Sequence, residues 1–146
     1  MARKKVLPTT EEYSTFIQHL ELVNVLLKDM SVSKTAKLIP EAILGFEIHT
    51  AKPKLDPFPG GFCACVTYTI KLSQQIEATA KPEYFAQMKI TLEGIYNNDL
   101  EISAEIFEVF AGMNLPVNLW PYLREMVHSL SLRMGFPGLI LPVHKV

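Results

Sequence analysis

Two segments, 62–73 and 86–96, alternate strictly between apolar and polar side chains. In the first segment, for example, Val66, Tyr68 and Ile70 are separated by threonines. This period of two residues is typical of a β-strand that has one buried face and one face in water. The alternation therefore predicts two strands of an antiparallel sheet, and it constrains the fold more than any other feature of the chain.

Two earlier segments, 20–33 and 42–50, are rich in β-branched and aliphatic residues and predict two more strands. The first of these is expected to bulge or bend near Lys28 and Asp29, where charges interrupt the apolar run. Loops are predicted at 52–61 and 73–83. Because no helical segment separates the four strands, we expect them to form a meander.

A short helix is predicted at 9–20, where Thr9 and Glu12 have the spacing of a capping box. A second helix is predicted around 103–113, with Ser103 as its cap. The second helix is apolar on two sides, so one side can face the sheet and the other a second subunit. The predicted interface residues are Ile106, Phe107, Val109, Phe110 and Met113.

A third helix is predicted at 119–134, with Asn118 as its cap and Pro121 in its first turn. Arg124 and Glu125 on this helix are either solvated charges or an anchor to a neighbouring element. The extended apolar tail "FPGLILPV" follows, and it can either line a groove or belong to the core. The fold class expected is α+β: a four-stranded antiparallel sheet with helices packed at its C-terminal end, in a single domain over 1–146.

The composition argues against several classes of protein. A net charge of −1 gives no electrostatic reason to expect nucleic acid as a partner. The uncharged runs are too short to span a membrane, and the basic N-terminus lacks the apolar stretch of a secretory signal. We therefore expect a cytoplasmic protein that does not insert into membranes.

The sequence also lacks the motifs of phosphate-binding loops, nucleotide-binding folds, serine hydrolases and zinc proteases. The four histidines are scattered, and none lies beside a candidate nucleophile. Cys63 and Cys65 are too close along a strand to pair easily, which favours two free thiols. No catalytic residue, metal or cofactor is predicted, and the chain is not expected to be an enzyme.

The C-terminal part of the chain resembles the SecB family of protein-export chaperones. The matching residues are Pro121, Tyr122, Arg124, Glu125, Arg133, Phe136, Pro137, Leu139 and Leu141. The segments "LKDMSVS" (27–33) and "EGIYN" (93–97) are similar to parts of the family's first and fourth strands. The order of the predicted elements agrees as well, so the resemblance covers roughly 20–143.

The resemblance implies a holdase that binds unfolded preproteins or other non-native polypeptides without ATP. It implies a homotetramer built as a dimer of dimers, with the helix at 103–113 packed between dimers. The peptide groove of the family lies between the sheet, the loop after the first strand, and the last helix with its tail. The implied peptide-binding residues are Leu38, Ile39, Ile43, Phe46, Trp120, Leu130, Leu132, Met134, Phe136, Leu139 and Leu141.

Two departures from the family argue against docking on the SecA motor. This sequence stops at Val146, where the export members continue into a helix and an acidic, often zinc-binding tail. The sheet of the family is acidic, whereas one predicted strand here carries Gln87 and Lys89. A SecB-like chaperone that serves a toxin–antitoxin pair is therefore an option beside general export. The alternatives are a small-molecule-binding or enzymatic domain of hot-dog or cystatin-like type, and a purely structural oligomer.

Overall fold

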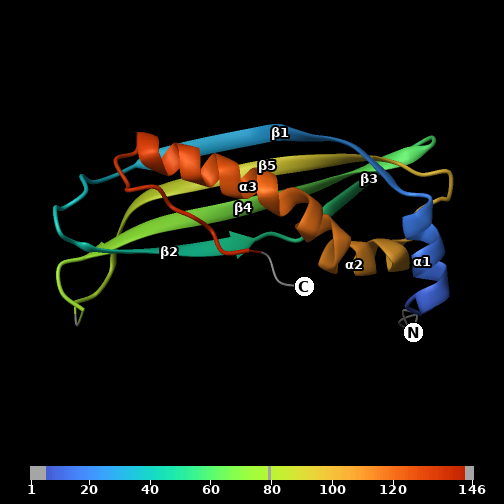
Figure 1. Cartoon of the computed structure of the whole chain (residues 1–146), viewed down its shortest axis with the longest axis horizontal. Coiled ribbons are helices and arrows are strands. Elements are labelled where there is room, and N and C mark those ends of the chain that lie inside the picture. The colour runs from blue at the N-terminus through green and yellow to red at the C-terminus, as the bar shows by residue number, and fades with distance from the viewer. Residues whose placement is uncertain (1–5, 79, 144–146) are drawn as a thin grey trace, which may run out of the picture.

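The computed structural model describes residues 6–78 and 80–143, so residues 1–5 of the basic N-terminus lie outside it. A sheet forms one layer and three helices lie on one of its faces (Figure 1). The elements are α1 (Thr10–Gln18), β1 (Glu21–Lys34), β2 (Ile43–Thr50), β3 (Lys54–Phe58), β4 (Gly61–Gln75), β5 (Glu83–Asn97), α2 (Ala104–Gly112) and α3 (Asn114–Arg133). The predicted α+β class is confirmed, but the sheet has five strands rather than four.

The strand order is β1-β5-β4-β2, so the predicted meander is wrong. After β1 the chain crosses to the opposite edge of the sheet and begins β2 there. Gln74 holds this crossover loop from inside the protein, because its buried side chain bonds the loop backbone twice. Its amide oxygen accepts from the Ile39 N–H at 2.8 Å, and its amide nitrogen donates to the Lys37 carbonyl at 3.0 Å. These bonds satisfy one N–H and one carbonyl group of the loop backbone.

The additional strand, β3, lies within the segment predicted as a loop. Both β2 and β3 pair with β4 along one edge, interrupted at residues 51–53. Pro57 is tolerated inside β3 because an edge strand does not need every N–H for the ladder. Gly60, with φ of 87°, then makes the tight turn into β4.

The alternation predicted for β4 and β5 is confirmed. From Phe62 to Leu72 in β4, every second side chain is buried beneath the helices, while the intervening ones lie on the other face. The predicted bulge in β1 is confirmed too, since its register with β5 shifts between Leu27 and Asp29. The core therefore lies between the sheet and the helices, where Leu123 and Val127 of α3 are fully buried.

The two predicted helix caps at Thr9 and Ser103 are confirmed, since each side chain accepts a backbone N–H at 3.1 Å. The start of α3 was predicted wrongly. It begins at Asn114 because only Met113, with φ of −120° and ψ of −78°, separates it from α2. Asn118 lies inside α3, and its amide donates to the Tyr96 hydroxyl at 3.0 Å instead of capping.

Pro121 also lies inside α3 rather than in its first turn. A proline at this position removes one helix hydrogen bond, and the exposed position of Pro121 lets water reach the freed carbonyl group.

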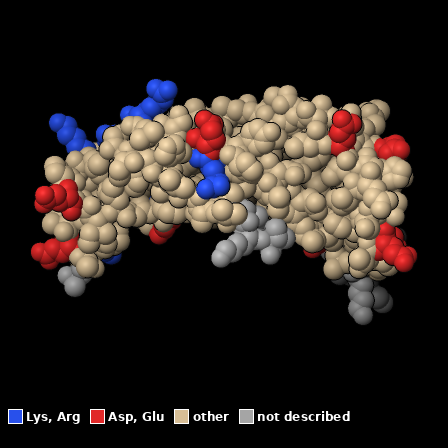
Figure 2. Space-filling view, in the orientation of Figure 1, with Lys and Arg blue, Asp and Glu red and all other residues tan. Residues whose placement is uncertain are grey.

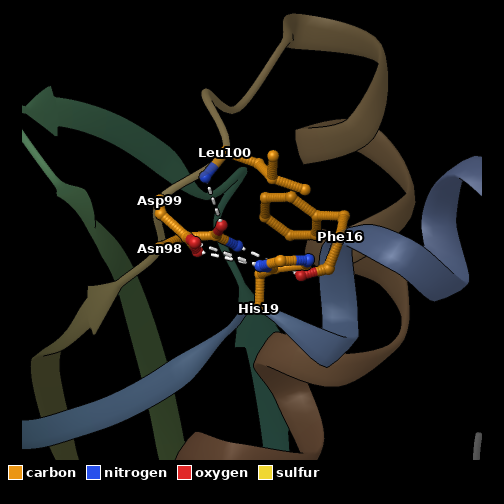
Figure 3. A network of polar contacts seen from close by, with 5 residues as sticks. All are labelled: Phe16, His19, Asn98, Asp99 and Leu100. Carbon is orange, nitrogen blue, oxygen red and sulfur yellow. Dashed lines mark hydrogen bonds and ion pairs between the residues drawn. The ribbon is translucent and has the colours of Figure 1, made fainter.

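Polar contacts with Asn98 and Asp99, which follow β5, attach the C-terminal end of α1 to the sheet (Figure 3). The Asn98 amide donates to the Phe16 carbonyl at 3.1 Å, and its oxygen accepts from the Leu100 N–H at 2.8 Å. His19, at the end of α1, lies 3.0 Å from the Asp99 carboxylate. The Phe16 ring is buried in the core. These contacts fix the helix end at the point where the chain enters β1.

Candidate functional site

The C-terminal tail, residues 136–143, turns back and runs beside α3 (Figure 1). Gly135, with φ of 87°, ends the helix in the left-handed conformation. The buried Ser131 then holds the first part of the tail. Its hydroxyl accepts from the Leu139 N–H at 2.8 Å, and its carbonyl accepts from the Phe136 N–H at 2.9 Å.

Two side chains of α3 hold the second part of the tail. The Arg124 guanidinium donates to the Leu141 carbonyl at 2.9 Å. The Trp120 indole N–H donates to the Pro142 carbonyl at 2.6 Å. Arg124 therefore anchors a neighbouring element, which is one of the two roles predicted for it, whereas Glu125 is exposed.

The tail has an inner and an outer side. Phe136, Leu139 and Leu141 point inward and are buried, and the Phe136 ring stacks on Phe85 with ring centres 6.2 Å apart. The resemblance implied that these three residues line a peptide groove, but their side chains are buried in the core. Ile140, which the sequence reasoning missed, is 67% exposed. The alternation of the tail was the signal that could have found it.

The other implied peptide-binding residues differ in exposure. Met134 is buried at the end of α3. Those that are partly buried are Leu38, Trp120 and Leu130. Those that are exposed are Ile39, Ile43, Phe46 and Leu132. The exposed ones come from the crossover loop, β2 and α3, the three elements that the resemblance named, so their role in binding stays a prediction.

Two adjoining hollows of about 250 and 530 Å³ lie where α2 and the start of α3 meet the segment between β2 and β3. They share Pro53 and Ala111 in their walls. We call them together the α2–α3 groove. Its residues are Thr50, Lys52, Pro53, Leu55, Val66, Tyr68, Ala104, Phe107, Glu108, Ala111, Gly112, Pro116 and Trp120. Trp120 is the one implied peptide-binding residue that lines it.

The groove is lined mainly by apolar side chains. Tyr68 meets Trp120 edge-to-face, with ring centres 6.2 Å apart. Burial raises the pKa of Tyr68 to about 12, so its hydroxyl stays neutral in the groove. Figure 2 shows few charged side chains on the helix-bearing face, most of them around its edge. Sequence reasoning missed Pro53 and Leu55 because their segment was assigned to a loop.

Phe110 corrects the predicted oligomer interface. Its ring is fully buried in the same chain, with ring centres 5.5 Å from Phe62 and 5.1 Å from Tyr96. A side chain without exposed surface cannot contact a second subunit. The half-buried Ile106, Phe107 and Val109 and the exposed Met113 keep surface available, and their part in an interface stays a prediction.

The opposite face of the sheet, which we call the open face, carries Cys63 and Cys65 as free, half-buried thiols. Burial and a hydrogen bond with Glu93 raise the pKa of the Cys65 thiol, although the Lys28 ammonium at 3.6 Å opposes the shift. Within residues 6–78 and 80–143, no three His, Cys, Asp or Glu side chains are grouped to hold a metal ion. In the same part of the chain, no helix is long and apolar enough to cross a membrane.

Comparison with known proteins gives relatives at low identity. A scan against protein-family models finds no match. The chain is 23% identical over 110 residues to the protein-export protein SecB of Anaplasma marginale, covering 74% of this chain and 62% of that protein. It is 24% identical over 110 residues to SecB of Anaplasma phagocytophilum, covering 74% of this chain and 70% of that protein.

One solved structure has a similar fold over nearly the whole chain. It is the Mycobacterium tuberculosis SecB-like chaperone in complex with a ChAD peptide from the HigA1 antitoxin. The TM-score is 0.79 at 17% identity, and the match covers 92% of this chain and 97% of that one. The resemblance predicted from the C-terminal motif is therefore confirmed, and the chain is SecB-like in both sequence and fold.

Proposed function

We propose that this chain is an ATP-independent holdase that binds non-native polypeptides on its helix-bearing face. The observation that carries the proposal is the α2–α3 groove, an apolar hollow on a face with few charges. The names of the similar proteins, a protein-export protein and a SecB-like chaperone, support a chaperone role. A catalytic role has no comparable support, and neither does a hot-dog or cystatin-like fold.

Apolar burial suits a client whose sequence varies, because it needs no matching hydrogen-bond pattern. The groove offers Tyr68, Phe107 and Trp120 as walls, and aromatic walls accept many apolar side chains. Outside the groove, Ile140 and Leu132 offer further apolar surface on the tail and on α3. A non-native chain can therefore contact several sites at once, which strengthens weak individual contacts.

The test compares two isoleucines that are equally exposed but lie in different places. Ile140 is 67% exposed on the tail, and Ile76 is 72% exposed in the turn after β4. We expect Ile140→Asp to weaken suppression of aggregation of a denatured client in nucleotide-free buffer, because a carboxylate opposes apolar burial. The matched variant Ile76→Asp should protect the client as well as the unchanged protein does.

Three results would count against this proposal. The unchanged protein could fail to reduce client aggregation at excess. Its protection could require ATP. The two aspartate variants could lose protection equally, which would show that the exposed side of the tail makes no specific contact with the client.

We also propose that copies of the chain associate through β1. This edge strand of 14 residues pairs with β5 on one side only. Its exposed apolar residues are Leu22, Val23, Leu26, Leu27, Met30 and Val32. An unprotected apolar edge strand is prone to pair with another chain, and two identical edges can pair about a two-fold axis. Such a pair is half of the dimer of dimers implied by the resemblance.

Light scattering tests the assembly. Leu27→Glu should lower the molar mass, because it places a carboxylate on the half-exposed edge that the two copies would share. Ile76→Glu, which adds the same charge away from β1, should leave the mass unchanged. A monomer for the unchanged protein at micromolar concentration would count against assembly.

The cytoplasmic location stays a prediction from the composition. Docking on SecA stays the alternative that the sequence disfavours. One similar protein carries an export name and another holds an antitoxin peptide. Both are consistent with non-native polypeptide as the client class, and we propose no narrower class.

A further inference from the structure

The open face of the sheet carries a second hollow, of about 520 Å³, whose chemistry differs from that of the α2–α3 groove. We call it the lysine hollow. Its residues are Lys28, Asp29, His49, Ala51, Lys52, Lys54, Cys65, Thr67, Thr69, Lys89 and Thr91. They come from all five strands or from the segment between β2 and β3, so the whole width of the sheet builds it.

Strand register places lysines on two sides of a threonine floor. Lys54 lies on β3 at one edge, and Lys89 lies on β5 opposite Thr69 of β4. Neighbouring strands are about 4.8 Å apart and successive residues of a strand about 3.4 Å, so the backbones of Lys54 and Lys89, four β4 positions apart, are separated diagonally by roughly 16 Å. Between them, the hydroxyls of Thr67 and Thr91 share a hydrogen bond of 2.8 Å. An extended chain that crosses the strands along this diagonal can reach both lysines.

Positive charge exceeds negative charge in this hollow. The charged residues of its wall are Lys28, Lys52, Lys54, Lys89 and Asp29. Lys28 is 3.7 Å from the Glu93 carboxylate and is partly neutralised by it. Among the described residues, no ion pair engages Lys52, Lys54 or Lys89. The chain as a whole has a net charge of −1, so the lysine hollow is a local concentration and not a sign of general basicity.

We propose that the lysine hollow binds an acidic segment of a partner polypeptide in an extended conformation. Carboxylates along such a segment reach lysines on both sides, and threonine hydroxyls donate to the same carboxylate oxygens. Nucleic acid fits less well, because the described wall contains no aromatic ring for base stacking.

The experiment measures binding of a fluorescent peptide of alternating glutamate and serine to the full chain at low salt. The test variant is Lys54→Glu with Lys89→Glu, which leaves the α2–α3 groove untouched. The control is Lys37→Glu with Lys81→Glu, which changes the net charge equally but lies in exposed loops. We expect about tenfold weaker binding for the test variant, since two attractions become repulsions. The control should bind like the unchanged protein.

Binding should also weaken with added salt, because exposed charges are screened. Absence of binding by the unchanged protein, an equal loss in both double variants, or tighter binding of an oligonucleotide of equal charge would each overturn the proposal. Suppression of client aggregation is measured on the same variants. It should be unaffected by Lys54→Glu with Lys89→Glu, so failure of this site is distinguishable from failure of the holdase proposal.

Discussion

The two faces of this sheet come from the same alternating strands but differ in what covers them. On the helix-bearing face, Val66, Ile70 and Leu92 lie beneath the helices and the tail. On the open face, Thr67 and Thr91 lie in a hollow bordered by lysines. One face is therefore an apolar surface with an apolar groove, and the other is a polar surface with a hollow in which positive charge exceeds negative charge. The comparison indicates that one sheet can offer a different binding chemistry on each face.

The largest effect is expected from a charge placed in the helix-bearing face. Phe110→Glu buries a carboxylate among aromatic rings, which costs about 3–5 kcal/mol or more against a typical total of about 5–15 kcal/mol. We expect this variant to lose cooperative unfolding as followed by circular dichroism. Gln87→Glu adds the same charge on the open face and should change the unfolding midpoint little. If Phe110→Glu instead folds and has a lower molar mass, Phe110 belongs to the subunit interface and not to the core.

The next effect separates the two sides of the tail. Leu141 is fully buried, so Leu141→Ala should lower the free energy of unfolding by about 2–5 kcal/mol. Ile140→Ala, one residue earlier but mostly exposed, should cost less than about 1 kcal/mol and reduce client binding. Denaturant unfolding and client titration of both variants give the comparison. Equal stability losses would mean that both sides of the tail belong to the core.

A third effect appears only in alkali. Burial raises the pKa of Tyr68 and Tyr96 to about 12 from an ordinary 10.0. The folded state thus favours the neutral phenols, and this stabilisation is complete below pH 10 and lost as the pH rises through 12. For each tyrosine the loss is on the order of 2 kcal/mol.

Tyr68→Phe should therefore reduce the fall in unfolding free energy between pH 10 and 12, as measured with denaturant. Tyr122→Phe, on the exposed side of α3, controls for the loss of a hydroxyl. An unchanged pH dependence in the Tyr68 variant would contradict the burial of that ring on the helix-bearing face.

The smallest effect is expected on the open face. Lys28 and Glu93 form an ion pair at 3.7 Å in which the Lys28 side chain is exposed, so solvent screens the attraction and the pair contributes little to stability. Lys28→Ala should therefore shift the thermal midpoint only slightly, and less at high salt. A shift as large as that of Leu141→Ala would show that the open face contributes to stability as strongly as the core.

Local features were predictable from sequence because they depend on neighbours along the chain. The alternation of β4 and β5, the caps at Thr9 and Ser103, and the bulge after Leu27 follow from side-chain period and local hydrogen bonds. The SecB-like fold followed from a motif centred on α3 and its tail. Part of the candidate surface, including Trp120, followed from the same resemblance.

Other features depend on which segments meet in space, and only the tertiary structure decided them. β1 pairs with β5, and the crossover loop after β1 is held by Gln74, which lies 35 residues after Ile39. The proline-rich segment forms β3 because it lies at an edge, where a missing N–H is harmless. Asn118 is not a cap, because the helical backbone is interrupted at Met113 and α3 begins directly after it, at Asn114.

The same distinction explains the tail and the interface. The sequence determined that residues 136–143 are extended and apolar, because prolines and glycines prevent a helix there. It did not determine which side chains point inward, because this depends on where Ser131 and Arg124 hold the backbone. Likewise the apolar helix α2 was recognisable, but only the surrounding rings show that Phe110 belongs to the core. Apolar character is a property of the residue, whereas burial is a property of the space into which the fold places it.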